Sequence, residues 1–358
     1  MPIRVIAWGM GYLGKQGLLQ ILGDPALELV GLHVSGDDKR GRVAGEIAGT
    51  APTGVIATSI IDELLALGAD CLIYFASTVG RDAEATAEIL PFLAAGTNVV
   101  SISHFDLQYP AHGDPRHVDP IVAACERGGS SFLLTGEEPG FAFGQQFFAI
   151  LSTIARLDAV RIVEMSDVQG YGGTDSLLMY GFNGDPAVEP PMFTSQVGAS
   201  WHIATLMGIA DFLGLAVDRI EQQWDSIAVD YPIDTAAFGE VVAGRTAATR
   251  WRVTAHCLGR PMIRYEKILR LHHAAAPEWE APALAKGAGV THKIFVEGAP
   301  EVSEELHRPR GTSATPTIAV NAVPFVCAAP PGVLTQMDIP LFPPRQFGSD
   351  GTAQGVSA

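Results

Sequence analysis

Three glycines near the start of the chain have the spacing that lets a backbone turn hold a dinucleotide. Gly9, Gly11 and Gly14 stand in WGMGYLGKQ, directly after a short apolar run and before a segment with helical spacing. In this pattern the first glycine permits a tight turn, the second lets the backbone approach a pyrophosphate, and the third allows the helix to pack closely on the strand. The N-terminus of the helix then offers N–H groups to the phosphates. We therefore predict a dinucleotide site here. The alternative is a glycine-rich turn without a ligand.

The residues after the second predicted strand indicate which dinucleotide fits. An NAD site usually has an acidic residue there, which binds the ribose 2′-hydroxyl. This chain has Ser35 instead, followed by Lys39 and Arg40, and a hydroxyl beside cations suits a 2′-phosphate. We predict a preference for NADP(H), with NAD(H) also usable if Asp37 or Asp38 reaches the ribose. The alternative for the basic residues is a solvated loop face. The whole predicted cofactor site consists of Gly9, Gly11, Tyr12, Leu13, Gly14, Ser35, Lys39, Arg40, Ala76 and Ser77.

Alternation of short apolar strands with helical segments places the glycine turn in a parallel sheet. The predicted strands are residues 4–8, 27–34, 71–77, 97–103 and 130–136. They are apolar throughout, as expected when helices cover both faces of a sheet built from right-handed βαβ units. After Phe141 the segments become longer, and polar and apolar residues alternate, as in TRWRVTAHC. The predicted fold class is α/β: a Rossmann-type parallel-sheet domain and an α+β second domain with a mixed, mostly antiparallel sheet.

The same patterns divide the chain into two domains and a tail. We predict a dinucleotide-binding domain over residues 1–140 and a substrate and dimerisation domain over residues 141–312. A C-terminal helix over residues 313–342 is apolar enough to pack back on the first domain. The last residues, 343–358, are rich in Gly, Ser, Pro and Gln, which predicts a loose tail.

Titratable side chains follow the fourth and fifth predicted strands, where a doubly wound sheet binds its substrate. His104 is suited to proton transfer near neutral pH, and Asp106 could bind a cationic amine or hold His104 in one tautomer. The alternative is that both residues only shape the loop. Glu138 is a candidate base or ammonium partner beside Glu137. The alternative for this acidic pair is an interaction with a helix N-terminus.

A glycine-rich stretch of the second domain supplies aromatic residues that could line an apolar substrate pocket. It reads QGYGGTDSLLMYGFNG, and the helical segment that follows adds a tryptophan and a histidine. The pocket candidates are Tyr171, Tyr180, Phe182, Trp201 and His202. The alternative for each of them is plain core packing. The scattered histidines share no ligand spacing with a cysteine or an acid, so the sequence predicts no metal site.

Composition excludes several classes of partner. The formal net charge of −16 predicts a surface that repels nucleic acid and anionic membranes. No apolar run reaches the roughly 20 residues of a membrane span, and the N-terminus has no signal-peptide pattern. The four cysteines are far apart, as expected for free thiols in a reducing compartment. We therefore expect a cytoplasmic protein whose partner is a small molecule.

Several segments resemble the dihydrodipicolinate reductase-like superfamily, and within it the branch of 2,4-diaminopentanoate dehydrogenase and the native amine dehydrogenases. They are GMGYLGKQGLLQIL, TNVVSIS, the G-x-x-P-G-F of residues 136–141, and NAVPFVCAAPPGV. The resemblance implies a Rossmann domain, a mixed-sheet second domain, use of NAD(P)H and a homodimer. The histidine-histidine-x-x-lysine run of true dihydrodipicolinate reductases is missing. The glutamate that native amine dehydrogenases place shortly after the NVV strand is missing too, and His104 and Asp106 stand there instead.

The leading prediction is an NAD(P)H-dependent oxidoreductase that acts on C=N or CH–NH2 groups. It would aminate a ketone or aldehyde reductively, or run the reverse deamination of an amine, with the hydride chemistry supplied by the cofactor. One alternative is a related carbonyl or cyclic-imine reductase. An alternative of another class is a catalytically silent NADP(H)-binding sensor or scaffold, which the missing glutamate leaves open.

Overall fold

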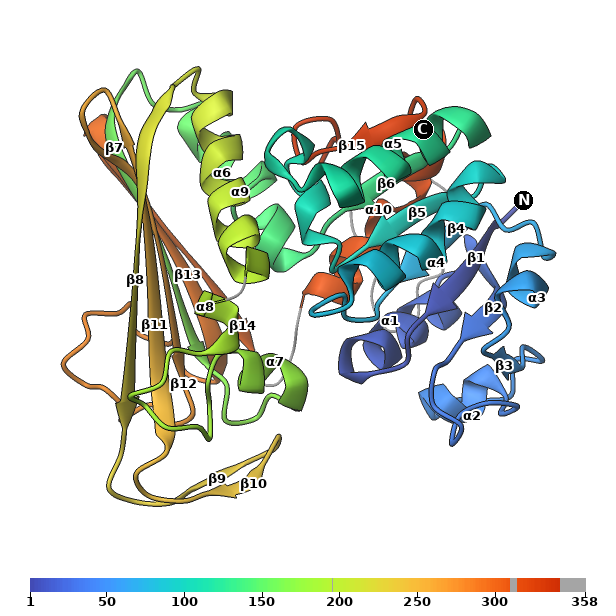
Figure 1. Cartoon of the computed structure of the whole chain (residues 1–358), viewed down its shortest axis with the longest axis horizontal. Helices are drawn as coiled ribbons and strands as arrows, with labels where there is room; N and C mark the ends of the chain where they lie inside the picture. Colours follow the sequence, from blue (N-terminus) through green and yellow to red (C-terminus); the bar gives the residue numbers. More distant parts are fainter. Residues whose placement is uncertain (195, 310–313, 342–358) are drawn as a thin grey trace. The chain divides into compact units, whose positions relative to one another are not determined.

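In the computed structural model the chain forms two compact units (Figure 1). Unit 1 comprises Met1–Phe141 and Ala314–Ala358, so it is built from both ends of the chain, and unit 2 comprises Ala142–Ser313. The structure describes residues 1–194, 196–309 and 314–341. The tail predicted over 343–358 lies outside the described residues. No helix in the described part of the chain is long and apolar enough to cross a membrane.

Unit 1 contains a seven-stranded sheet with the order β15-β6-β5-β4-β1-β2-β3, and its strand pairs are parallel. β4 pairs with one edge of β1, and β2 pairs with the other edge. The direction of winding therefore reverses beside β1, and this confirms the predicted Rossmann-type sheet. Its strands are β1 (Ile3–Trp8), β2 (Leu27–His33), β3 (Ala57–Thr58), β4 (Cys71–Tyr74), β5 (Asn98–Ser101), β6 (Ser131–Leu134) and β15 (Gly332–Leu334).

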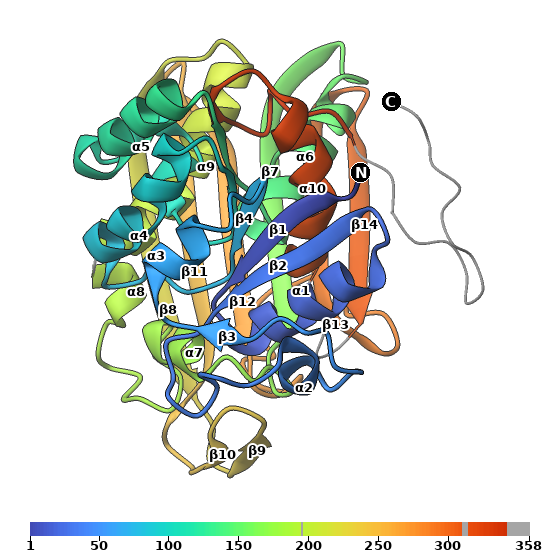
Figure 2. The ribbon, with the colours of Figure 1, turned by 90° about the vertical axis from the view of Figure 1, so that its right-hand side faces the viewer.

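Helices cover both faces of this sheet. Val5 and Ala7 belong to one apolar cluster, and Ile6 and Trp8 belong to another, because successive side chains of a strand point to opposite faces. On one face α1 and α10 contact each other (Figure 2), and on the other α4 and α5 do so. The helices of unit 1 are α1 (Tyr12–Gly23), α2 (Ala44–Ala48), α3 (Ile61–Leu65), α4 (Asp82–Ala94), α5 (Pro115–Gly128) and α10 (Thr315–Ala328), with the short turns η1 (Phe105–Leu107), η2 (Pro110–His112) and η3 (Glu137–Phe141).

The C-terminal helix is shorter than the range 313–342 suggested. α10 ends at Ala328, and Ala329 is extended, with φ −73° and ψ 155°. Pro330 and Pro331 follow, and a residue before proline is disfavoured in the helical conformation. The chain then adds β15 to the edge of the parallel sheet. Val320 and Val323 of α10 are buried in the core of unit 1.

Unit 2 is built on a six-stranded sheet with the order β14-β13-β7-β12-β11-β8. β7 and β12 are parallel and the other neighbours are antiparallel, which confirms the predicted mixed sheet. β14, an edge strand of mostly polar residues, has too little apolar alternation to be predicted from sequence. The strands are β7 (Arg156–Asp167), β8 (Val217–Ala228), β11 (Thr246–Cys257), β12 (Arg260–Arg270), β13 (Ala288–Ala299) and β14 (Val302–Pro309), with a hairpin of β9 (Ile233–Thr235) and β10 (Gly239–Val241).

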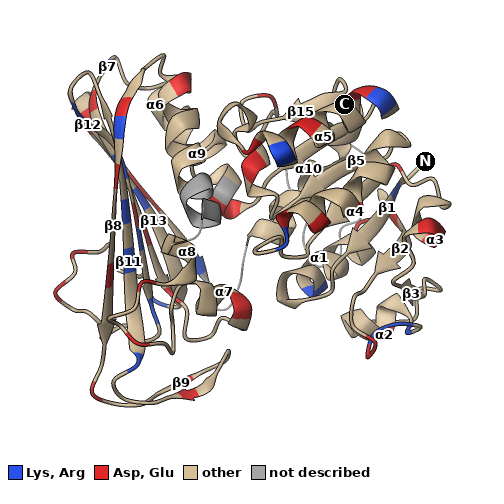
Figure 3. Cartoon of the chain, in the orientation of Figure 1, with Lys and Arg blue, Asp and Glu red and all other residues tan. Residues whose placement is uncertain are grey.

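One face of the unit 2 sheet is covered by a helix and the other is rich in charge. α9 (Gln196–Phe212) contacts β11, β12 and β8, and Trp251 and Tyr265 are buried on that side. The alternate residues of these strands carry charges, and Lys and Arg lie along the strands of the sheet (Figure 3). The other helices of unit 2 are α6 (Gln145–Leu151), α7 (Thr174–Met179) and α8 (Pro191–Thr194).

Candidate functional site

Two glycines of the turn between β1 and α1 are required by the protein's own packing. Gly9 has φ +88°, which favours glycine, and a Cβ added there would lie 2.7 Å from the backbone nitrogen of Ala76. A Cβ added at Gly14 would lie 1.9 Å from the carbonyl oxygen of Gly9. The structure therefore brings Ala76, just beyond β4, against the glycine turn. Ser77 follows it and is exposed.

Gly11 has no such packing reason. It is exposed, its φ of −78° suits any residue, and an added Cβ would meet no described heavy atom within 4 Å. It is the N-cap of α1, and the structure shows no side-chain cap there. Glycine at such a position leaves room for a ligand to approach the backbone, and the N-terminus of α1 favours a negative charge. Tyr12 and Leu13, which begin α1, are half-buried. The turn therefore fits the pyrophosphate of a dinucleotide.

The side chain of Lys39, on the loop after β2, contacts the glycine turn. The Nζ of Lys39 donates to the carbonyl oxygen of Met10 at 3.2 Å. Ser35 is exposed at the start of the loop. Arg40 instead forms an ion pair with Asp37 at 3.0 Å, in which both side chains are exposed, so the pair adds little to stability. The basic side chain that the structure brings to the glycine turn is thus Lys39.

His104 lies in the core and not on the surface beyond β5. Its side chain is 4% exposed, and its Nδ1 lies 2.7 Å from the Oγ of Ser101. The rings of Tyr74 and Phe132 pack edge-on against it. Burial lowers the pKa of His104 to about 4, so the imidazole is neutral near pH 7. This enclosed position supports the alternative that His104 only shapes the loop, and it argues against a proton shuttle.

Asp106 pairs with a residue that the sequence analysis did not single out. Its Oδ2 lies 2.7 Å from the Nδ1 of His117, and its Oδ1 accepts the backbone N–H of Asp114 at 3.3 Å. Asp106 therefore orients His117, which is near the start of α5. The hypothesis that Asp106 holds His104 in one tautomer is corrected, because the two Asp106 oxygens contact His117 and the N–H of Asp114, while Ser101 contacts the His104 Nδ1.

The two glutamates after β6 have different surroundings. Glu137 is buried, and its carboxylate accepts the backbone N–H of Ala314 at 3.2 Å, while its own N–H donates to the Oγ1 of Thr315 at 3.1 Å. These bonds place Glu137 at the N-terminus of α10, as the helix-terminus interpretation predicts. Glu138 follows it in the single π-helical turn η3 and is half-buried.

The aromatic pocket candidates of unit 2 are mostly buried. Tyr180, Phe182 and His202 are at most 4% exposed, and Tyr171 is half-buried. The side chain of Trp201 lies outside the described residues. The ring of His202 packs against Trp251 and Tyr265, with centroid distances of 4.1 and 5.0 Å, and the ring of Tyr180 lies 5.8 Å from the Nζ of Lys267. The ring of Tyr180 therefore lies beside a buried charged side chain.

Lys267 belongs to a row of cross-strand neighbours that sequence reasoning missed. The strand register places His292 of β13 opposite Glu164 of β7, Glu164 beside Lys267 of β12, and Lys267 opposite Trp251 of β11. Side chains at matched positions of adjacent strands lie on the same face of a sheet. His292, Glu164 and Lys267 are 3%, 5% and 7% exposed. Charged residues at positions where the alternation expects apolar ones were the available signal, but the sequence does not show how strands pair.

The carboxylate of Glu164 is the centre of this row. Its Oε2 accepts from the Nζ of Lys267 at 2.5 Å and lies 3.8 Å from the Nε2 of His292. Its Oε1 accepts the hydroxyl of Ser166 at 2.6 Å. Burial by itself raises the pKa of Glu164, but Lys267 and His292 outweigh burial and hold the pKa well below its usual range. Glu164 is therefore an ionised carboxylate among buried side chains.

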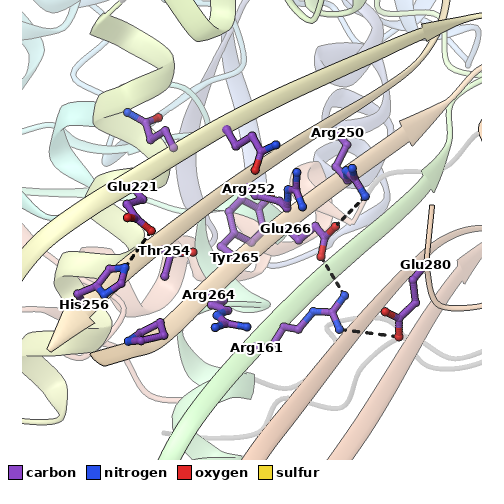
Figure 4. A pocket seen from close by; sticks show the side chains of 13 residues that line it. Arg161, Glu221, Arg250, Arg252, Thr254, His256, Arg264, Tyr265, Glu266 and Glu280 are labelled. Carbon is purple, nitrogen blue, oxygen red and sulfur yellow. Dashed lines mark hydrogen bonds and ion pairs between the residues drawn. The ribbon is translucent and has the colours of Figure 1, made fainter. Parts of the chain in front are cut away.

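The opposite face of the same strands holds a charged cavity of about 720 Å³ (Figure 4). There Arg161 of β7 lies 2.9 Å from Glu266 of β12, and Arg250 and Arg252 of β11 both lie 2.9 Å from Asp225 of β8. These ion pairs link β7 to β12 and β11 to β8 on that face of the sheet. The cavity contains none of the residues predicted to bind cofactor or substrate.

A doubly wound parallel sheet with an open glycine turn, joined to a mixed-sheet unit, is typical of dinucleotide-dependent oxidoreductases. The family model of the 2,4-diaminopentanoate dehydrogenase C-terminal domain matches residues 192–350. An amine dehydrogenase of Streptomyces virginiae is 30% identical over 351 residues, which are 95% of this chain and 97% of that protein. The chain therefore belongs to the amine dehydrogenase family, whose members are NAD(P)-dependent oxidoreductases.

Solved structures agree with this fold. An amine dehydrogenase of Mycobacterium smegmatis is similar with a TM-score of 0.80 and 20% identity, covering 97% of this chain and 99% of that one. An oxidoreductase of Agrobacterium radiobacter, solved with NAD+, L-tartaric acid and magnesium, has a TM-score of 0.53 and 12% identity, covering 94% and 92%. At these identities the likeness concerns the fold alone.

Proposed function

We propose that this protein catalyses the reductive amination of a ketone or aldehyde with ammonia, or the reverse oxidation of a primary amine, with a preference for NADP(H). The observation that carries the cofactor part is the open position at Gly11 beside Lys39, which is bonded to the glycine turn. Membership of the amine dehydrogenase family supports the amine part. A homodimer is proposed with it, as the resemblance implies.

The proposed cofactor contacts follow the geometry of unit 1. The backbone from Gly9 to Gly14 and the N-terminus of α1 bind the pyrophosphate, while Ser35 and Lys39 bind the 2′-phosphate. Ala76 and Ser77, just beyond β4, bound the same site. The bound cofactor supplies the hydride. His104 has no proposed role in proton transfer, because its ring is enclosed in the core.

A panel of ketones and aldehydes, tested with and without ammonium, checks the reaction type. We expect loss of NADPH absorbance that depends on ammonium, with formation of the corresponding amine. Loss of absorbance that is independent of ammonium would instead identify a carbonyl reductase. Tight NADPH binding, measured by nucleotide fluorescence, together with no turnover on the whole panel would leave the sensor or scaffold as the function.

The Lys39→Ala substitution tests the cofactor preference. We expect it to raise the Kd for NADPH about tenfold or more, because a charge-assisted hydrogen bond is worth roughly 1.5–3 kcal/mol. The Kd for NADH should change much less, since NADH lacks the 2′-phosphate. Arg42→Ala is the matched control, because Arg42 lies on the same loop but faces Glu46. Equal changes for both nucleotides in Lys39→Ala would contradict the proposed 2′-phosphate contact.

A further inference from the structure

The titratable residues of unit 1 that the sequence offers for proton transfer are mostly engaged in the fold. His104 is enclosed in the core, Asp106 holds His117, and the carboxylate of Glu137 accepts the N–H of Ala314 at the start of α10. Reductive amination nevertheless moves several protons, because ammonia must be released from ammonium and a hydroxyl must leave as water. Titratable groups of unit 2 are therefore candidates for moving these protons.

We propose that Glu164, Lys267 and His292 form the acid–base group of this enzyme, binding ammonium and moving the protons of imine formation. This inference rests on the proposed function. The three residues come from neighbouring strands of unit 2 and meet at one carboxylate oxygen, the Oε2 of Glu164.

Stability does not explain why charges occupy this row. Taking an ion pair out of water costs several kcal/mol per ion, and replacing a buried ion pair by well-packed apolar residues is often neutral or stabilising. Large apolar side chains occupy the neighbouring positions of the same row, which continues through Trp251 of β11 and Trp224 of β8. Charged groups that a fold keeps in such a place are more often functional than charged groups at the surface.

The surroundings of Glu164 are suited to a small cation. The ring of Tyr180 faces the Nζ of Lys267 at 5.8 Å, and the ring of Phe143 packs on Tyr265 and on His292. Among these mostly apolar rings an ionised carboxylate attracts a cation more strongly than it does in water. Within unit 2, the titratable groups that face the carboxylate are Lys267 and Tyr265 from β12 and His292 from β13, with His202 of α9 behind Tyr265.

The chemistry balances with these groups. Ammonium bound at Glu164 gives one proton to His292, whose Nε2 lies 3.8 Å from the Oε2 of Glu164, and the ammonia forms a C–N bond to the carbonyl carbon. Lys267 then protonates the hydroxyl of the carbinolamine, the C–O bond breaks, and water leaves a cationic imine. The proton held by His292 returns to Lys267 through the carboxylate of Glu164, which Lys267 contacts at 2.5 Å. Hydride from the bound cofactor would reduce the imine, so one carbonyl compound, one ammonium ion and one NAD(P)H yield one amine, one water and one NAD(P)+.

Two substitutions test this assignment with the carbonyl substrate that the wild type uses best. Glu164→Gln keeps the shape of the side chain but removes its charge, and we expect kcat/KM for ammonium to fall at least about a hundredfold. Lys267→Arg keeps the positive charge but cannot release its proton, so we expect kcat to fall by about the same factor. The Kd for NADPH, measured by fluorescence, should stay within about twofold of the wild type in both.

Glu266→Gln is the matched control. Glu266 is the neighbour of Lys267 in sequence and pairs with Arg161 across the same two strands, but on the opposite face of the sheet. We expect its turnover to stay within about threefold of the wild type. If Lys267→Arg turns over at the wild-type rate, the row is structural and the assignment is overturned. A loss in Glu266→Gln as large as that in Glu164→Gln would overturn it as well.

A single substitution in a buried ion pair can unfold a protein, so the double variant Glu164→Gln/Lys267→Met removes both charges together. The assignment is supported if the double variant folds and binds NADPH but has lost ammonium-dependent turnover. The assignment fails if the double variant folds and turns over normally. Failure of the proposed function is a different result, because the wild type itself would then show no ammonium-dependent turnover.

Discussion

Lowering the pH from 7 to 5 is expected to cost unit 1 about 4 kcal/mol of unfolding free energy, because two of its histidines are buried in the neutral form. Burial lowers the pKa of His33 and of His104 from 6.5 to about 4. The folded state therefore binds these protons more weakly than the unfolded chain does. The contribution of the neutral histidines to the unfolding free energy is fully present above pH 6.5 and is lost as the pH falls toward 4. At pH 5 the loss is about 2 kcal/mol for each histidine.

The measurement is urea unfolding at pH 7 and pH 5, followed by tryptophan fluorescence. His33 stacks on Trp8, with ring centroids 3.5 Å apart and planes at 10°, so His33→Phe keeps the stack and removes the titration. His104→Gln removes the other titration. We expect the double variant to lose most of the difference between the two pH values, whereas His112→Gln, at an exposed position, should keep it. A double variant as sensitive to acid as the wild type would show that other groups cause the effect.

Alanine at Gly11 and at Gly14 is expected to separate ligand binding from folding. Gly14→Ala places a Cβ 1.9 Å from the carbonyl oxygen of Gly9, and neither backbone can move without displacing α1 from β1. We expect a loss of about 2–3 kcal/mol of unfolding free energy together with loss of NADPH binding. Gly11→Ala meets no described atom within 4 Å, so its unfolding free energy should change by less than about 1 kcal/mol.

The Kd for NADPH should nevertheless rise at least about tenfold in Gly11→Ala, because the new methyl group occupies the space through which the pyrophosphate approaches the backbone. Thermal unfolding and fluorescence titration of the two variants give both quantities. Wild-type NADPH affinity in Gly11→Ala would mean that the ligand does not approach this backbone position.

The parts of the fold that depend on neighbouring residues could be predicted from sequence. The glycine turn is one of them, because Gly9 and Gly14 meet each other within a single turn and its flanking strand and helix. The apolar strands of unit 1 are another, since Val5 and Ile6 must both be buried when helices cover both faces. The alternation in β11 likewise indicated a sheet with one covered face.

The tertiary structure decided where individual polar side chains lie and which partners they contact. His104 and Asp106 are two residues apart, yet the loop after β5 buries the ring of His104 in the core and places the carboxylate of Asp106 against His117. Glu164 and Lys267 are 103 residues apart and meet only because β7 and β12 pair in parallel in one register. Local sequence therefore determined the turn, the strands and the class of cofactor. The partners of each charge depended on strand pairing, because a shift of one residue would turn every side chain of a strand to the other face.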